Sequence, residues 1–160
     1  MLKVSFKDDC IKVQTFNNKA TVVTIVGELI IPNKLLYVLP PEINKWINDH
    51  PAVDATSYAL TNLKVSGKSV CSDEDTFNAE TGKRIAESRA KIRLYKFMHT
   101  LCTKILLNFY GLMYGVPEGA SAIHTAVISD SHGGLQEECK KYATLWVKES
   151  QHLGKLLEEA

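Results

Sequence analysis

The segment from Ala79 to Tyr114 constrains the fold more than any other part of the sequence. Its 36 residues contain no proline, and only Gly82 and Gly111 are weak helix formers. At 100° per residue, one broad stripe collects the apolar residues Ala86, Ala90, Leu94, Phe97, Met98, Leu101, Ile105 and Phe109. The spacing predicts one long helix over residues 79–114. Its second half, ILLNFYGLMYG, is apolar nearly all round, so either the rest of the fold or another copy of the chain must bury it.

The first 71 residues are typical of strands. Val4 and Phe6, then Ile11 and Val13, alternate with polar residues, and Asn17-Asn18 predicts a turn before the run ATVVTIVGELII. Alternation returns over residues 56–71. Between these parts lies a proline-rich stretch near 32–51, with Pro32, Pro40, Pro41 and Pro51, which is too interrupted for a long regular element. One short helix is possible there, over residues 42–48.

Helices follow the strands in the second half of the chain. A last helix is predicted over residues 135–158. The run AIHTAVIS before it favours a short strand or a helix, and SDSHGG favours a loop. Strands first and helices last predict a single α+β domain over residues 1–160, an N-terminal antiparallel β-sheet with a long central helix and a C-terminal helix.

Composition narrows the class of protein. The chain has 160 residues, 19 Lys+Arg against 18 Asp+Glu, and 45% hydrophobic residues, as in an ordinary globular domain. No apolar run reaches the roughly 18 residues of a membrane span, and MLKVSFKDDC does not resemble a secretory signal. Four scattered cysteines without a CxxC argue against a zinc site and a disulfide framework. We expect a cytoplasmic protein with no membrane partner, no metal and no cofactor.

Positive charge gathers on the long helix. Residues 83–104 hold seven basic residues and one acid, Glu87, a local charge of +6 in a chain of net charge +1, which leaves −5 elsewhere. Arg89, Arg93 and Lys96 fall within about 60° of one another on the helical wheel. Two explanations stay open. Acids of the last helix, such as Glu137, Glu138 or Glu149, pair with these cations, or an anionic ligand does, since two arginines one turn apart suit a phosphate.

The start of this helix adds a second candidate feature. Asp75 or Asn78 is suited to cap the helix, and the free amides of its first turn favour an anion. Phe77 precedes the helix, where it would either pack on Thr81 or Gly82 as a hydrophobic staple or stack on a base. The acids Asp73, Glu74 and Asp75 are more typical of caps than of a metal site.

Enzyme motifs are absent from the sequence. There is no GxGxxG, P-loop, GxSxG or HExxH, and His124-Thr125 with His132 does not match a two-histidine phosphodiesterase. Cys71 before the helix could act as a thiolate, but the three acids that follow nearby would raise its pKa, so a buried thiol is favoured. An enzyme acting on nucleotides, with His124 in its site, ranks behind the binding functions.

Residues 65–96, about a fifth of the chain, carry a family resemblance. The run VSGKSVCSDEDTFNAETGKRIAESRAK, a strand ending in Gly and Cys, then Asp-x-Phe-Asn, Glu-x-Gly-Lys and Ala-x-x-Arg-Ala, resembles a pattern in small phage-encoded proteins. The family with the most similar architecture is the first Thoeris anti-defence family, oligomeric sponges that sequester cyclic ADP-ribose isomers and in some members cyclic oligonucleotides. The resemblance implies a sheet plus helices, a dimer or a dimer-built hexamer, pockets at subunit interfaces and no catalysis. Residues 32–51 and the C-terminal 40 residues fall outside it.

The preferred hypothesis is therefore a non-enzymatic protein that binds and sequesters a small phosphorylated nucleotide, in the host cytoplasm if phage-encoded. The candidate ligand-binding residues are Phe77, Asn78, Arg84, Arg89, Arg93 and Lys96. The alternative is a phage protein that binds nucleic acid or a host protein with the same basic edge. Both hypotheses predict a homo-oligomer, with the apolar run 105–114 and the face of Trp146 as the expected dimer contacts.

Overall fold

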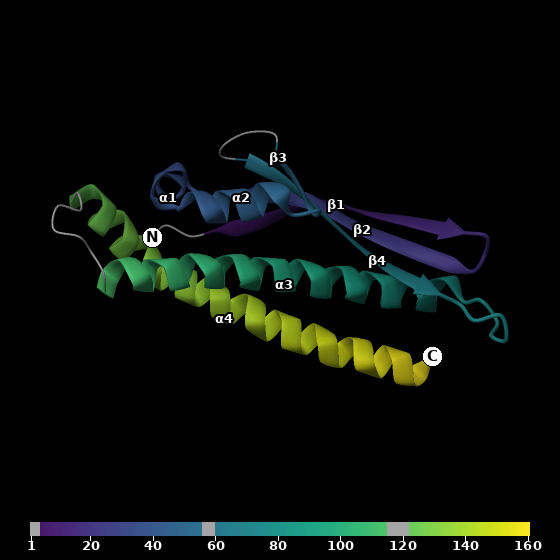
Figure 1. The fold of residues 1–160 in the computed structure, drawn as a ribbon. Helices are drawn as coiled ribbons and strands as arrows, with labels where there is room; N and C mark the ends of the chain where they lie inside the picture. Colours follow the sequence, from purple (N-terminus) through teal and green to yellow (C-terminus); the bar gives the residue numbers. More distant parts are fainter. Residues whose placement is uncertain (1–3, 56–59, 115–121) are drawn as a thin grey trace.

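The computed structural model describes residues 4–55, 60–114 and 122–160 (Figure 1). An antiparallel sheet comes first and two long helices come last, so the α+β prediction is confirmed. The elements are β1 (Ser5–Phe16), β2 (Ala20–Ile30), α1 (Asn33–Val38), α2 (Pro41–Asp49), β3 (Val53–Ala55), β4 (Leu60–Val70), α3 (Ala79–Tyr114) and α4 (Ala122–Glu159).

The sheet has the strand order β1-β2-β4-β3, with every neighbouring pair antiparallel. The predicted turn joins β1 to β2. Asn17 and Asn18 both have φ of 51°, the left-handed conformation that a tight hairpin turn requires and that asparagine tolerates. The N–H of Lys19 closes this turn on the carbonyl of Phe16 at 3.0 Å. The β1–β2 register shifts between Asp8 and Cys10, which places a bulge at Asp9.

One face of the sheet is buried under α3. Along β2 the residues alternate between buried and half-buried, and Val23, Ile25 and Leu29 are its buried apolar side chains. The helix approaches β4 very closely at Gly67, because a β-carbon there would overlap the carbonyl oxygen of Ala86. Glycine at position 67 is therefore required by the packing of α3 on the sheet.

The proline-rich segment contains two helices, of which the sequence predicted only the second. Pro32 and Pro40 stand at the N-caps, where a missing N–H costs nothing. Leu35 of α1 and Ile43 and Ile47 of α2 are buried in the same core as the second half of α3. The six residues of α1 are too few to be stable alone, so burial of its leucine side chains holds this helix in place.

The last helix begins at Ala122, thirteen residues before the predicted start, and the predicted loop over SDSHGG is wrong. Gly133 and Gly134 each disfavour a helix by about 1 kcal/mol. Packing outweighs this cost, because Leu135 and Tyr142 next along the helix are buried against the core. Figure 1 shows α3 and α4 running side by side below the sheet.

The described part of the apolar run on α3 is buried within the chain. Ile105, Leu106 and Phe109 join one cluster with Leu35 and Leu135, whereas Leu107 is 64% exposed. The chain's own helices therefore cover Ile105, Leu106 and Phe109. Among the described residues, no helix has the length and apolar character needed to cross a membrane.

Candidate functional site

The basic edge of α3 lies along the open edge of β4. Among the described residues, β3 pairs with residues 61–63 of β4, so the later part of β4 has no neighbouring strand on the side away from β2. Arg89 donates from Nη1 to the carbonyl of Lys68 at 2.6 Å, and Arg93 donates from Nη1 to the carbonyl of Ser66 at 2.7 Å. Each guanidinium satisfies a carbonyl that would otherwise face solvent, and this protects the strand edge.

Two of the acids proposed as partners for these arginines, Glu138 and Glu149, contact other residues. Glu149 accepts a hydrogen bond from Ser88 Oγ at 2.7 Å, and the carboxylate of Glu138 lies 3.7 Å from the ammonium of Lys141. Within the described part of the chain, no ion pair joins Arg89 or Arg93 to an acid. No acid among the described residues therefore neutralises these two guanidinium groups.

The same stripe of α3 continues to an aromatic cluster at α2. Arg93, Lys96 and Lys104 are exposed, and the ammonium of Lys104 lies 5.4 Å from the centroid of the Trp46 ring. The Trp46 ring stacks on buried Phe97 at 5.4 Å with an interplanar angle of 16°. This contact brings a tryptophan from the proline-rich segment to the basic edge.

A shallow hollow of about 420 Å³ opens beside Trp46, with mainly apolar walls. Its lining residues are Glu42, Lys45, Trp46, Asp49, His50 and Pro51. The His50 ring lies edge-on to Phe97 at 4.7 Å, and its Nδ1 accepts a hydrogen bond from the N–H of Ala52 at 3.1 Å. Burial lowers the pKa of His50, and the accepted bond fits the same neutral form of the ring.

The start of α3 forms a separate region, about 37 Å along the helix from Lys104. Asn78 is the cap, since its Oδ1 accepts from the N–H of Thr81 at 3.1 Å and its carbonyl accepts from the N–H of Gly82 at 2.9 Å. Phe77 is half-buried, and Arg84 is exposed on the next turn. The structure thus assigns Asn78 a clear structural role at the helix terminus.

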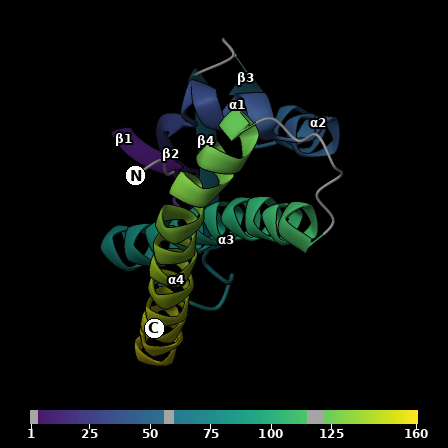
Figure 2. The ribbon, with the colours of Figure 1, turned by 90° about the vertical axis from the view of Figure 1, so that its left-hand side faces the viewer.

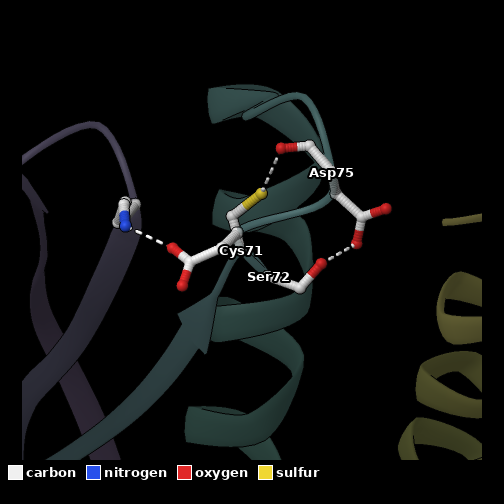
Figure 3. A network of polar contacts seen from close by, with 5 residues as sticks. Cys71, Ser72 and Asp75 are labelled. Atoms are coloured by element: carbon white, nitrogen blue, oxygen red, sulfur yellow. Dashed lines mark hydrogen bonds and ion pairs between the residues drawn. The ribbon is translucent and has the colours of Figure 1, made fainter.

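The loop before α3 is tied together by its own polar groups (Figure 3). Cys71 Sγ donates to the carbonyl of Asp75 at 3.4 Å, and Ser72 Oγ donates to the Asp75 carboxylate. Asp73 pairs with Lys19 on the β1–β2 hairpin, and the N–H of Cys71 donates to the carbonyl of Lys19 at 2.7 Å. Two of the three acids therefore order the loop.

The predicted site residues do not form one cluster. At 1.5 Å per residue, about 26 Å of helix separates Ala79, next to Phe77 and Asn78, from Lys96. Arg89, Arg93 and Lys96 form one group, and Phe77 with Asn78 forms another. Sequence reasoning missed Trp46, His50 and Lys104 as site residues. The available signal was a tryptophan in the short helix predicted among the prolines, with a histidine four residues later, just beyond the end of that helix.

The described residues offer no group of metal ligands, and the Cys102 thiol is buried. No group of three or more His, Cys, Asp or Glu side chains in that part of the chain could hold a metal ion. Cys102 is fully buried, and burial raises the pKa of its thiol to about 12. The side chain of His124 lies outside the described set.

No protein-family model matches the chain, and no curated protein or solved structure is significantly similar to it.

Proposed function

We propose that the basic edge of α3, together with the hollow at α2, binds a small phosphorylated nucleotide and sequesters it without turnover. The contact between Lys104 and Trp46 carries this proposal, because it joins a row of cations to an aromatic surface. Phosphates need charged donors and bases need a flat apolar partner, and nucleotide sites combine the two.

Each part of the site has a distinct role in this proposal. Arg93 and Lys96 contact phosphate oxygens, with Arg93 held in position by its bond to the carbonyl of Ser66. Trp46 offers its indole to a base once the flexible Lys104 side chain moves toward a phosphate. About 17 Å of helix separates Arg93 from Lys104, which favours a ligand with more than one nucleotide unit or a cyclic dinucleotide-like shape.

The ligand class follows from the resemblance of residues 65–96 and from this spacing: a cyclic ADP-ribose isomer or a cyclic oligonucleotide. We propose that the protein acts in the cytoplasm, that of the host cell if a phage encodes it, where such signals are made and where its four free cysteines stay reduced. A homo-oligomer remains part of the proposal.

Calorimetry with cyclic ADP-ribose isomers and cyclic di- and trinucleotides tests this function. We expect Arg93→Ala and Lys104→Gln each to weaken binding about tenfold, through loss of one charge-assisted contact. Lys155→Ala is the matched control, since it removes an exposed cation from α4. If no ligand in the panel binds more tightly than high micromolar, the proposal fails.

A further variant separates the two groups of candidate residues. Phe77→Ala lies at the start of α3, far from Trp46, so it should leave the affinity unchanged. Loss of binding in Phe77→Ala with full binding in Lys104→Gln would move the site to the helix terminus.

The second candidate is a nucleic-acid binder, favoured by Lys64 and Lys68, which are exposed on the face of β4 opposite α3 and add positive charge beside the strand edge that Arg89 and Arg93 cover. Binding to DNA or RNA would then weaken steeply with salt, and Arg93→Ala would flatten the slope by about one unit. The affinity for a small ligand bound by three cations would depend far less on the salt concentration.

A further inference from the structure

Strand β1 is an edge strand of the sheet, and no other described strand pairs with its outer edge. Figure 2 shows it on the side of the sheet away from α1 and α2. Every residue from Lys7 to Phe16 is exposed, whereas residues of the neighbouring β2 are buried or half-buried. A strand of 12 residues with an open edge presents a row of unpaired backbone groups.

The direction of these backbone groups follows from the contacts of β4. The carbonyls of Ser66 and Lys68 point away from β2, toward Arg93 and Arg89. Because antiparallel strands alternate, Val65 and Gly67 bond to β2.

The alternation can be followed across β2 to β1. The β2 partners of Val65 and Gly67 are Ile25 and Val23, so Thr24 between them directs its backbone toward its β1 partner, Lys12. The backbone groups of Lys12, and by the same alternation those of Gln14, therefore form hydrogen bonds with β2. The neighbouring residues along the strand are Ile11, Val13 and Thr15, and their N–H and C=O groups point to the open edge.

The side chains of these three residues lie on the same face as the buried residues of β2. Ile11 is paired with Ile25 and Val13 with Val23, yet Ile11 is 48% exposed and Val13 is 44% exposed. Exposed β-branched residues beside free backbone groups favour pairing with another strand. The stretch from Cys10 to Phe16 has a regular register and a single charge, at Lys12, so little protects this edge.

We propose that two copies of the chain pair through β1 in antiparallel orientation, about a two-fold axis at Val13. Val13 then lies opposite Val13 of the partner subunit, and Ile11 opposite Thr15 of the partner subunit. All three outward residues make hydrogen-bonded pairs, and the two sheets become one continuous sheet.

Charge and the bulge select this register among those possible. A register centred on Lys12 sets two lysines directly opposite each other, which is unfavourable. One centred on Ile11 runs into the irregular backbone at Asp9. In the register centred on Val13, Lys12 faces Gln14 of the partner subunit. Asp8 and Asp9 lie toward the partner's hairpin turn, which carries a lysine and no acid.

This surface differs from the long-helix interface expected from the sequence, and it does not depend on the ligand site. A second copy is the occupant that fits the strand, because the segment 11–15 is compatible with itself in side-chain size and charge. An unrelated extended peptide would need a matching pattern of its own.

Sedimentation of the full chain at micromolar concentrations tests the proposal. We expect a dimer that Val13→Lys weakens about tenfold or more, since two ammonium groups would meet on the axis. Val70→Lys is the matched control, because Val70 is 62% exposed on β4, and should leave the dimer intact. Circular dichroism checks that both variants fold. A monomeric parent chain, or equal dissociation constants for Val13→Lys and the parent, would overturn the proposal.

Disulfide trapping tests the register without reducing stability. In a Cys10→Ser background, Val13→Cys should form a covalent dimer on mild oxidation, since hydrogen-bonded partners have Cα atoms about 5.5 Å apart. Ile11→Cys in the same background should not, because four residues of strand, about 13 Å, separate the two cysteines. Trapping of Ile11→Cys alone would exclude the axis at Val13.

Discussion

Arg93 donates from Nη1 to the backbone carbonyl of Ser66 across 2.7 Å, which ties the middle of α3 to the open edge of β4. Arg89 repeats the contact one turn earlier at Lys68. The two arginines thus have two possible functions, strand protection and ligand binding, that can be measured separately.

Replacing either arginine should lower stability as well as affinity. We expect Arg89→Ala and Arg93→Ala each to reduce the free energy of unfolding by about 1 kcal/mol, the net value of one exposed hydrogen bond to a charged donor. Urea denaturation measures this. Lys96→Ala, which removes an exposed cation without a described contact, should stay within about 0.5 kcal/mol of the parent. A loss as large in Lys96→Ala would show that the carbonyl contacts contribute nothing specific.

Gly67→Ala should destabilise the fold strongly. The added methyl group would overlap the carbonyl oxygen of Ala86 and lie 2.5 Å from the backbone nitrogen of Ala90, so α3 must move off the sheet. We expect a loss of about 3 kcal/mol or more in urea denaturation.

The control for Gly67→Ala is Gly154→Ala in α4, where no neighbouring atom lies within 4 Å of the added carbon. A helix interior favours alanine over glycine, so this change should raise stability by about 0.5–1 kcal/mol. The opposite signs of two identical substitutions test the close approach of helix and sheet. If Gly67→Ala unfolds like the parent, that approach is wrong.

Stability should fall as the pH drops below the ordinary His50 pKa of about 6.5. Burial lowers the pKa of His50 in the folded chain, so the unfolded chain binds more protons in this range and acid favours unfolding. His50→Asn keeps an acceptor for the N–H of Ala52 but does not titrate. The drop in urea midpoint between about pH 8 and about pH 5 should be smaller in this variant. An unchanged drop would assign the pH dependence to other groups.

The cysteines should react with a thiol reagent in order of exposure. Cys10 is exposed and should react first, and Cys71 more slowly. Cys102 should react only on unfolding, because it is fully buried and burial raises its pKa to about 12. Cys10→Ser, followed by mass spectrometry, identifies the fast site. Rapid labelling of Cys102 in the native chain would contradict its place in the core.

The long helix and the hairpin could be predicted from the sequence because their signals are local. The apolar stripe of α3 and the pair Asn17-Asn18 need no knowledge of the rest of the fold. Helix α1 and the first third of α4 could not be predicted, since both contain weak helix formers and depend on packing at Leu35 and Leu135.

In the candidate site, too, only the features with a local sequence signal could be predicted. Helical spacing placed Arg89, Arg93 and Lys96 on one stripe, but the carbonyl acceptors on β4 belong to the backbone and leave no trace in composition. Trp46 came from a segment that the resemblance does not cover. Its contact with Phe97 joins residues 51 positions apart, and such pairs have no local signal.

The strand order has a consequence for how the chain reaches this fold. β1 and β2 form a local hairpin, but β4 joins β2 only after residues 31–59 have passed, and Ala20 meets Val70 across 50 positions. Closing such a loop is slower than forming a hairpin. Until β4 docks, the hairpin has two open edges instead of one. Refolding yield should therefore decline as protein concentration rises, because chains caught at this stage can add to one another from both sides.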